Sequence, residues 1–247
     1  MIQINENKTN QLGEILKYKK YNIIQVGGIM TTVYLIRHSV RMTKSDIETY
    51  NTSQNELLKN EKIILSVQGE KRAELLCNKE ELKNIDVIYT SNSVRTLQTA
   101  KYLMYNQNLK ANIDERLDER RVGVPNSEKY PDWFERQYFD ENFKTEGGES
   151  QKEVRKRFTE VIDEILDKYD GKRIAVFSHG YAITFYLLQY CKFLGVNNNN
   201  LRYEFNGKIV FDKQINAPEL FKLTFDGRTL IDLEIIQFDD IPFNSGL

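Results

Sequence analysis

Short apolar runs alternate with longer amphipathic stretches along most of the chain. Three runs have the length of buried strands and end at polar or charged residues: 32–36, 85–91 and 174–177. A weaker strand pattern covers residues 110–117. Apolar residues at near-helical spacing predict helices over residues 66–82, 94–104, 150–169 and 181–194. A further helix is predicted to begin at Pro131. Strands that alternate with helices are typical of a largely parallel sheet covered by helices on both faces.

Capping signals support several of these helix boundaries. Ser66 stands at the N-cap position of the first helix, and Pro131 stands where a first helical turn accepts proline. Ser150 and Glu153 form the S-x-x-E pattern of a capping box ahead of a long amphipathic stripe. Gly171 ends that helix.

The pattern changes near the C-terminus. Residues 220–238 alternate apolar and polar positions about Asp226-Gly227, which predicts an antiparallel hairpin. The polar run 197–200 is most simply a loop. We therefore expect a three-layer α/β/α sandwich, with a mostly parallel sheet and an antiparallel edge formed by the C-terminal hairpin. This fold would make up a single domain over residues 30–247.

Residues 1–29 show little periodicity and carry no candidate chemistry. Their apolar part is too short and too interrupted by glycine for a signal peptide. The stretch from Val26 to Met30 can be encoded by bases that contain AGGAGG shortly before an ATG, as in a bacterial ribosome-binding site. Two interpretations stay open. Either the natural chain begins at Met30, or residues 1–29 form a genuine N-terminal extension.

Charge and cysteine content narrow the function classes. Lys and Arg number 35 and Asp and Glu 36, so no global field favours nucleic acid or an anionic membrane. Polar residues interrupt the most apolar stretch, 174–196, so we expect no membrane span. Cys77 and Cys191 lie far apart without CxxC spacing. This favours buried thiols over metal ligands, and a reduced, cytoplasmic setting.

The candidate chemistry lies at the ends of the three strong strand runs. His38 and His179 are the only histidines, and each follows an apolar run; Arg37 precedes the first histidine, and Arg95 follows the end of the second run. Each residue alone is more often structural than catalytic. Parallel strands bring their carboxyl ends to one edge of a sheet, where ligands bind. The resulting cluster of cations requires an anion, and guanidinium groups suit a phosphoryl group or a carboxylate. The sequence therefore predicts a phosphate site.

Six segments resemble, in order, those of the histidine phosphatase superfamily, the phosphoglycerate mutase-like clan. "LIRHSVRM" resembles its Arg-His signature, "LSVQGEKRAELL" a helix opening, and "YTSNSVRTLQTA" its Ser-x-x-x-Arg-x-x-Gln-Thr-Ala segment. "RLDERRVG" is similar to its Leu-x-Glu-x-x-x-Gly segment, "EGGES" to its Gly-Gly-Glu-Ser turn, and "IAVFSHG" to the segment of its second histidine.

The resemblance implies a role for each matched position. His38 would be the nucleophile that forms a phosphohistidine. Arg37, Arg95 and His179 would bind the phosphoryl oxygens as charge develops. Arg41 resembles a second arginine in one branch of the family and would add a phosphate contact.

Glu119 would be the general acid that protonates the leaving oxygen and then the base that activates water. By composition alone Glu119 does not differ from three nearby carboxylates: Asp114, Glu115 and Asp118. The spacing to Leu117 and Gly123 in the resembling segment selects Glu119.

The resemblance implies a metal-independent phosphomonoester hydrolase without a cofactor. The sequence contains no Walker loop, GxGxxG or HExxH pattern. The segments with which mutases of this clan bind substrate are not matched, so a phosphoglycerate mutase is the alternative. A second alternative is a non-catalytic module of the same fold that binds a phosphorylated ligand. The partner would be a small phosphate ester or a phosphoprotein, and a homodimer is left open.

Overall fold

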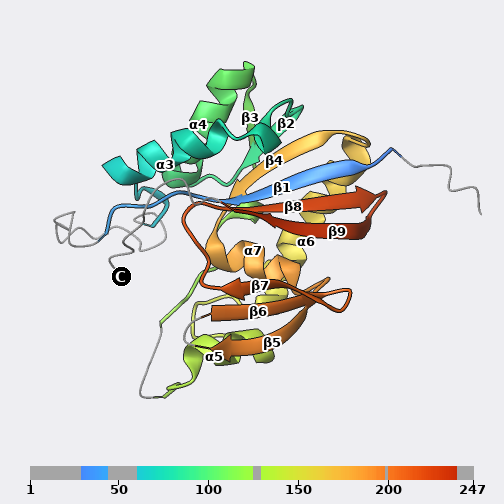
Figure 1. Cartoon of the computed structure of the whole chain (residues 1–247). Helices are drawn as coiled ribbons and strands as arrows, with labels where there is room; N and C mark the ends of the chain where they lie inside the picture. The colour runs from blue at the N-terminus through green and yellow to red at the C-terminus, as the bar shows by residue number, and fades with distance from the viewer. Residues whose placement is uncertain (1–28, 44–59, 125–128, 198–199, 238–247) are drawn as a thin grey trace, which may run out of the picture.

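The structure, a computed structural model, describes residues 29–43, 60–124, 129–197 and 200–237. Its centre is a six-stranded sheet of order β3-β2-β4-β1-β8-β9 (Figure 1). The strands are β1 (Thr31–Arg37), β2 (Val87–Thr90), β3 (Ala111–Ile113), β4 (Arg173–Ser178), β8 (Glu219–Asp226) and β9 (Thr229–Ile236). The first four run parallel, and β8 and β9 form an antiparallel hairpin at the edge, so the predicted sheet is confirmed.

Helices cover both faces of this sheet (Figure 1). α3 (Val67–Cys77) and α4 (Val94–Gln107) pack on one face, and α6 (Gln151–Lys168) and α7 (Gly180–Leu187) pack on the other. The predicted three-layer α/β/α architecture is therefore confirmed. No helix within the described residues combines the length and the apolar character needed to span a membrane.

The continuous apolar run of β1 follows from burial on both faces. Tyr34 and Ile36 belong to the core formed with α3 and α4, whereas Val33 and Leu35 belong to the core formed with α6 and α7. All four side chains are at most 1% exposed. Because successive side chains of a strand point to opposite faces, a central parallel strand needs an apolar residue at every position.

The predicted caps hold two helices in place. Ser66 Oγ accepts a hydrogen bond from the N–H of Gly69 at 3.0 Å, at the start of α3. Ser150 and Glu153 form the expected capping box, with bonds of 2.8 and 3.2 Å. Gly171, with φ of +71°, lies just beyond the end of α6.

The prediction of a helix over residues 181–194 is wrong in its second half. α7 ends at Leu187, and the chain then enters a separate antiparallel sheet of order β5-β6-β7. Its strands are β5 (Lys192–Asn197), β6 (Asn200–Phe205) and β7 (Lys208–Lys213). Of the loop expected over 197–200, Asn197 belongs to β5 and Asn200 to β6, and residues 198–199 lie outside the described residues.

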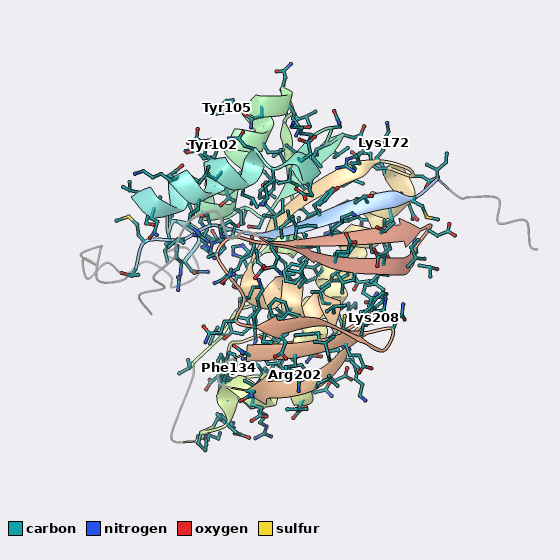
Figure 2. All side chains as sticks on the ribbon, in the orientation of Figure 1. Tyr102, Tyr105, Phe134, Lys172, Arg202 and Lys208 are labelled. Carbon is teal, nitrogen blue, oxygen red and sulfur yellow. The ribbon has the colours of Figure 1, made fainter. Side chains whose placement is uncertain are left out.

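Burial explains why this second sheet forms. Leu201, Tyr203 and Phe205 alternate with charged residues along β6 and are at most 9% exposed, within the core shared with α6 and α7. The short helix α5 (Trp133–Phe139) lies beside the same sheet, and Figure 2 shows Phe134 and Arg202 in this lower part of the molecule. Asn206 and Gly207 turn the hairpin with φ of +50° and +78°. This Asn-Gly pair is the signal that could have predicted the sheet.

Residues 1–28, which make up nearly all of the expected N-terminal extension, lie outside the described residues, as does Phe238 of the predicted hairpin. β1 begins at Thr31, whose Oγ1 accepts a hydrogen bond from the N–H of Gly171 at 2.8 Å.

A chain that begins at Met30 keeps all of β1 and this hydrogen bond. We expect its melting temperature in a thermal unfolding scan to stay within about 2 °C of the full chain, since about 1 kcal/mol shifts a domain of this size by about 2–4 °C. A loss of several degrees would show that residues 1–29 pack against the domain.

Candidate active site

The predicted strand ends meet at one edge of the central sheet. β1 and β2 flank β4 in parallel, with Arg37 in register with Ser178. The N–H of His38 donates to the carbonyl of Ser178 at 2.9 Å, directly after β1. The rings of His38 and His179 lie 5.2 Å apart, centroid to centroid, in an edge-to-face arrangement. Two imidazoles that are 141 positions apart in the sequence numbering are therefore neighbours.

A hydrogen bond to the backbone fixes the orientation of His38. Its Nδ1 lies 2.7 Å from the carbonyl oxygen of Ser39. A carbonyl oxygen can only accept, so Nδ1 carries the proton and Nε2 keeps a free lone pair. Thr99 Oγ1 accepts the N–H of Ser39 at 3.0 Å and holds this peptide unit in place. Burial, followed by the charges of Arg95 and Arg37, lowers the pKa of His38 well below its ordinary value. His38 is thus a neutral imidazole.

His179 is neutral for the same reasons. Arg95 Nη2 donates to its Nδ1 at 3.0 Å, so its Nε2 carries the proton and donates to Ser91 Oγ at 2.8 Å. Burial, followed by the charge of Arg95, lowers the pKa of His179 well below its ordinary value. The sequence did not indicate Ser91 as a partner of His179, although it lies in a segment that resembles the family.

The two arginines are partly satisfied by backbone carbonyls. Arg95 is 2% exposed and donates from Nη1 to the carbonyl of Asn60 at 2.6 Å. Arg37 donates from Nη1 to the carbonyls of Ile215 at 2.6 Å and Asn216 at 3.0 Å. Burial lowers the pKa of Arg37, and that of Arg95 to about 10. The Nε atoms of both arginines are buried and have no hydrogen-bond partner among the residues that the structure describes. Unpartnered cationic donors are costly to bury, which favours an anion at this place.

Glu119 lies against the N-terminus of α7, the helix that begins directly after His179. Its Oε1 accepts the N–H groups of Arg120 at 2.9 Å and Ala182 at 3.1 Å, and its Oε2 accepts that of Tyr181 at 3.4 Å. Its charge acts on Arg37 and Arg95, where it is the largest influence that opposes the effect of burial on their pKa values. Glu119 therefore shares the site with both arginines.

The alternative carboxylates have different surroundings. Asp114 accepts the Nε–H of Arg116 at 3.0 Å, and this side-chain bond lowers its pKa. Glu115 is exposed. Asp118 is half-buried and accepts the N–H of Asn92 at 3.1 Å, and burial raises its pKa to about 6. Asp118 is thus the main rival of Glu119.

Arg157 and Glu149 hold the segment that carries both of these carboxylates. Arg157 Nη1 donates to the carbonyls of Arg116 at 2.7 Å and Asp118 at 2.9 Å, and its Nε donates to Glu149 at 3.0 Å. Glu149 also accepts the N–H of Arg121 at 2.9 Å. No sequence signal singled out Arg157, because it lies on the polar side of an ordinary amphipathic helix.

Arg41 lies at the exposed rim of the site. Its backbone forms an isolated antiparallel bridge with Leu65, and its side chain is exposed. Its charge contributes to the lowered pKa values of Arg37, His38 and Arg95, so it belongs to the same cationic cluster.

Comparison with solved structures assigns the fold. The chain is similar to a mycobacterial glucosyl-3-phosphoglycerate phosphatase, with a TM-score of 0.59 and 17% identity over 83% of this chain and 97% of the other. A phosphoglycerate mutase from Bacillus anthracis gives a TM-score of 0.60 and 16% identity over 85% and 93% of the two chains. The fold is that of the phosphoglycerate mutases.

Comparison of sequences assigns the family. The profile of the histidine phosphatase superfamily (branch 1) matches residues 33–206, and the chain belongs to this superfamily. Phosphoserine phosphatase 1 of Hydrogenobacter thermophilus is 32% identical over 142 residues, which span 54% of this chain and 65% of that protein. A probable phosphoglycerate mutase of Yersinia enterocolitica is 30% identical over 164 residues, 62% of this chain and 72% of the other.

The raised pKa of Asp118 has a consequence for stability. The folded state binds its proton up to about pH 6, whereas the ordinary value of an aspartate is 3.8, so folding is disfavoured as the pH rises through this window. We expect Asp118→Asn to raise the melting temperature by about 2–4 °C at pH 7.5, the shift for roughly 1 kcal/mol after solvent screening, and not at pH 4.

Asp114 is the matched control, because its pKa is shifted in the opposite direction. Asp114→Asn should lower the melting temperature at pH 7.5, and this loss should shrink toward pH 3 as the wild-type carboxylate becomes protonated. Equal effects of Asp118→Asn at both pH values would show that its carboxyl titrates normally.

Proposed function

We propose that the protein is a phosphomonoester hydrolase that works through a phosphohistidine on His38. The observation that carries this proposal is the bond between His38 Nδ1 and the Ser39 carbonyl. It leaves the unprotonated Nε2 as the nucleophile, near the guanidinium groups of Arg37 and Arg95. An imidazole held neutral by its surroundings is ready to attack phosphorus without first losing a proton.

The reaction then runs in two displacements. His38 Nε2 forms a bond to phosphorus while the bond to the leaving oxygen breaks, and Glu119, in its acid form in the substrate complex, gives that oxygen its proton and becomes a carboxylate. In the second step water attacks the phosphohistidine, Glu119 takes a proton from the water, and inorganic phosphate leaves with His38 neutral again. Oε2 of Glu119 accepts only a 3.4 Å bond, so this oxygen is the better placed to exchange the proton.

The arginines would bind the phosphoryl oxygens. Phosphoryl transfer depends on positioning and on electrostatic stabilisation of the equatorial oxygens, which Arg37 and Arg95 offer through their unpartnered Nε atoms. Arg41 would add a contact from the rim. Nδ1 of His179 accepts from Arg95 and its Nε2–H donates to Ser91 Oγ, so His179 would bind a phosphoryl oxygen once Arg95 turns toward the phosphate and Nδ1 takes up a proton.

Hydrolysis is favoured over the mutase reaction. The relatives with about 30% identity are a phosphoserine phosphatase and a probable phosphoglycerate mutase, so both activities occur among similar chains. The substrate-binding segments of mutases have no match in this sequence. We propose a small phosphate ester as the substrate, and phosphoserine and 3-phosphoglycerate are the first two compounds to test. The proposed chemistry uses only protein side chains, without a metal ion.

The covalent step can be tested directly. Brief incubation with a labelled substrate and a quench without acid should trap phosphate on the peptide that contains His38, and this label should be lost in acid and survive base. Activity should be unchanged in EDTA. A label on Ser39 or Ser178, or loss of activity in EDTA, would contradict the scheme. Absence of both label and turnover would favour the non-catalytic module.

A second test separates Glu119 from Asp118. Nitrophenolate leaves readily without a proton, whereas an alkoxide does not. Glu119→Gln should therefore lower kcat/KM for an alkyl phosphate by about 10²–10⁴-fold, and much less for p-nitrophenyl phosphate. The ratio kcat/KM excludes breakdown of the shared phosphohistidine from the comparison.

Asp118→Asn is the matched control in this test, because it changes a neighbouring carboxyl in the same way. It should affect both esters equally and slightly. If Asp118→Asn shows the selective loss and Glu119→Gln does not, Asp118 is the general acid.

A further inference from the structure

The segment 214–218, which links β7 to β8, lies against Arg37, and charged side chains from three different elements hold its backbone. Arg37, at the end of β1, donates to the carbonyls of Ile215 and Asn216 at 2.6 and 3.0 Å. Arg72, on α3, donates from Nε to the carbonyl of Ala217 at 3.0 Å. Glu219, at the start of β8, accepts the N–H of Asn216 at 2.9 Å.

Glu219 is an unusual residue for this position. It is 1% exposed, although ionised carboxylates are costly to bury unless they are paired and hydrogen-bonded. Lys213 supplies the ion pair, with its Nζ 3.0 Å from Oε1, and the N–H of Asn216 supplies the bond to Oε2. Glu219 also stands opposite Arg37 in the antiparallel register of β1 and β8, and its charge opposes the effect of burial on the pKa of Arg37.

These contacts restrict the guanidinium of Arg37. Two carbonyls occupy its Nη1, while its Nε lies next to Gly180, where an added Cβ would be 3.4 Å from Nε and 3.8 Å from Ile215 Cγ2. Arg37 is thus held between segment 214–218 and the first residue of α7, which follows His179. Any shift of the segment would move the two carbonyls and, with them, the side chain of Arg37.

We propose that Glu219 is a positioning residue: through segment 214–218 it holds the Arg37 guanidinium in the orientation that binds the phosphoryl group. This inference rests on the proposed function insofar as Arg37 binds phosphate. The family profile ends at residue 206, so Glu219 and the segment lie outside the part of the chain that it matches. The competing explanation is that Glu219 only stabilises the start of β8.

A double-mutant cycle separates the two explanations. Glu219→Gln keeps the size of the side chain and removes its charge, and Arg37→Met removes the guanidinium. With Arg37 present, Glu219→Gln should lower kcat/KM and the affinity for inorganic phosphate, measured by calorimetry, by about tenfold, within the range of coupling between contacting residues. With methionine at position 37, the same change should alter both quantities by less than about twofold.

Glu234→Gln is the matched control. Glu234 accepts a 2.8 Å bond from Lys222, and Glu219 likewise accepts a bond from a lysine, Lys213, but Glu234 is exposed. It should leave kcat/KM and phosphate affinity unchanged in both backgrounds. If Glu219→Gln does not fold, Glu219→Asp enters the same cycle, because its shorter side chain keeps the charge and withdraws the carboxylate from Asn216.

Equal losses with and without Arg37 would overturn the proposal and leave Glu219 a structural residue, as would the absence of any effect with Arg37 present. Failure of the proposed function is distinguishable, because it would appear in the wild type as an absence of ester hydrolysis. The calorimetric affinity for inorganic phosphate would still report on the coupling between Glu219 and Arg37.

Discussion

Burial of two imidazoles beside two guanidinium groups is the constraint to which the rest of the site responds. Water would screen such a cluster of cations, but His38 and His179 are at most 5% exposed. Desolvation and the neighbouring arginines together keep both rings neutral. Of these four groups only the two arginines then carry a positive charge. The neutral His38 keeps the lone pair that nucleophilic chemistry needs.

The remaining charge is distributed over the elements around the sheet edge. Carbonyls from segments distant in the sequence accept hydrogen bonds from one amino group of each arginine, and the negative charge of Glu119 also acts on both. Glu119 is itself held by backbone N–H groups at the start of α7. The carbonyls and the carboxylate that offset the arginine charges therefore belong to elements that are positioned by their own packing. The geometry of the site thus depends on the packing of both helical layers against the sheet.

The sequence predicted the elements that carry strong local signals. Ser66, Ser150 with Glu153, and the hairpin at Asp226-Gly227 appear as expected, because caps and tight turns are decided by a few adjacent residues. The meeting of His38 and His179 was also predictable, since parallel strands order their ends. The second sheet was not predicted because residues 192–197 continue an apolar stretch, and a short apolar stretch is equally compatible with a helix and a strand. Packing against α5 and α7 favours the strand.

The partners of the site residues were beyond the reach of sequence reasoning. Arg157 and Glu219 are charged residues with no local pattern to distinguish them from solvated surface, yet Arg157 binds the backbone of residues 116 to 119 and Glu219 is buried opposite Arg37. Composition likewise could not separate Glu119 from Asp118, and the choice of Glu119 depended on the spacing in the segment that resembles the family. The structure gives these neighbours different environments: Glu119 faces the N-terminus of α7 and shares the field of Arg37 and Arg95, whereas Asp118 is desolvated against Asn92. Asp118 has an extended backbone, and successive side chains of an extended segment face opposite sides, so two adjacent carboxyls have different neighbours: Asn92 for Asp118 and the start of α7 for Glu119.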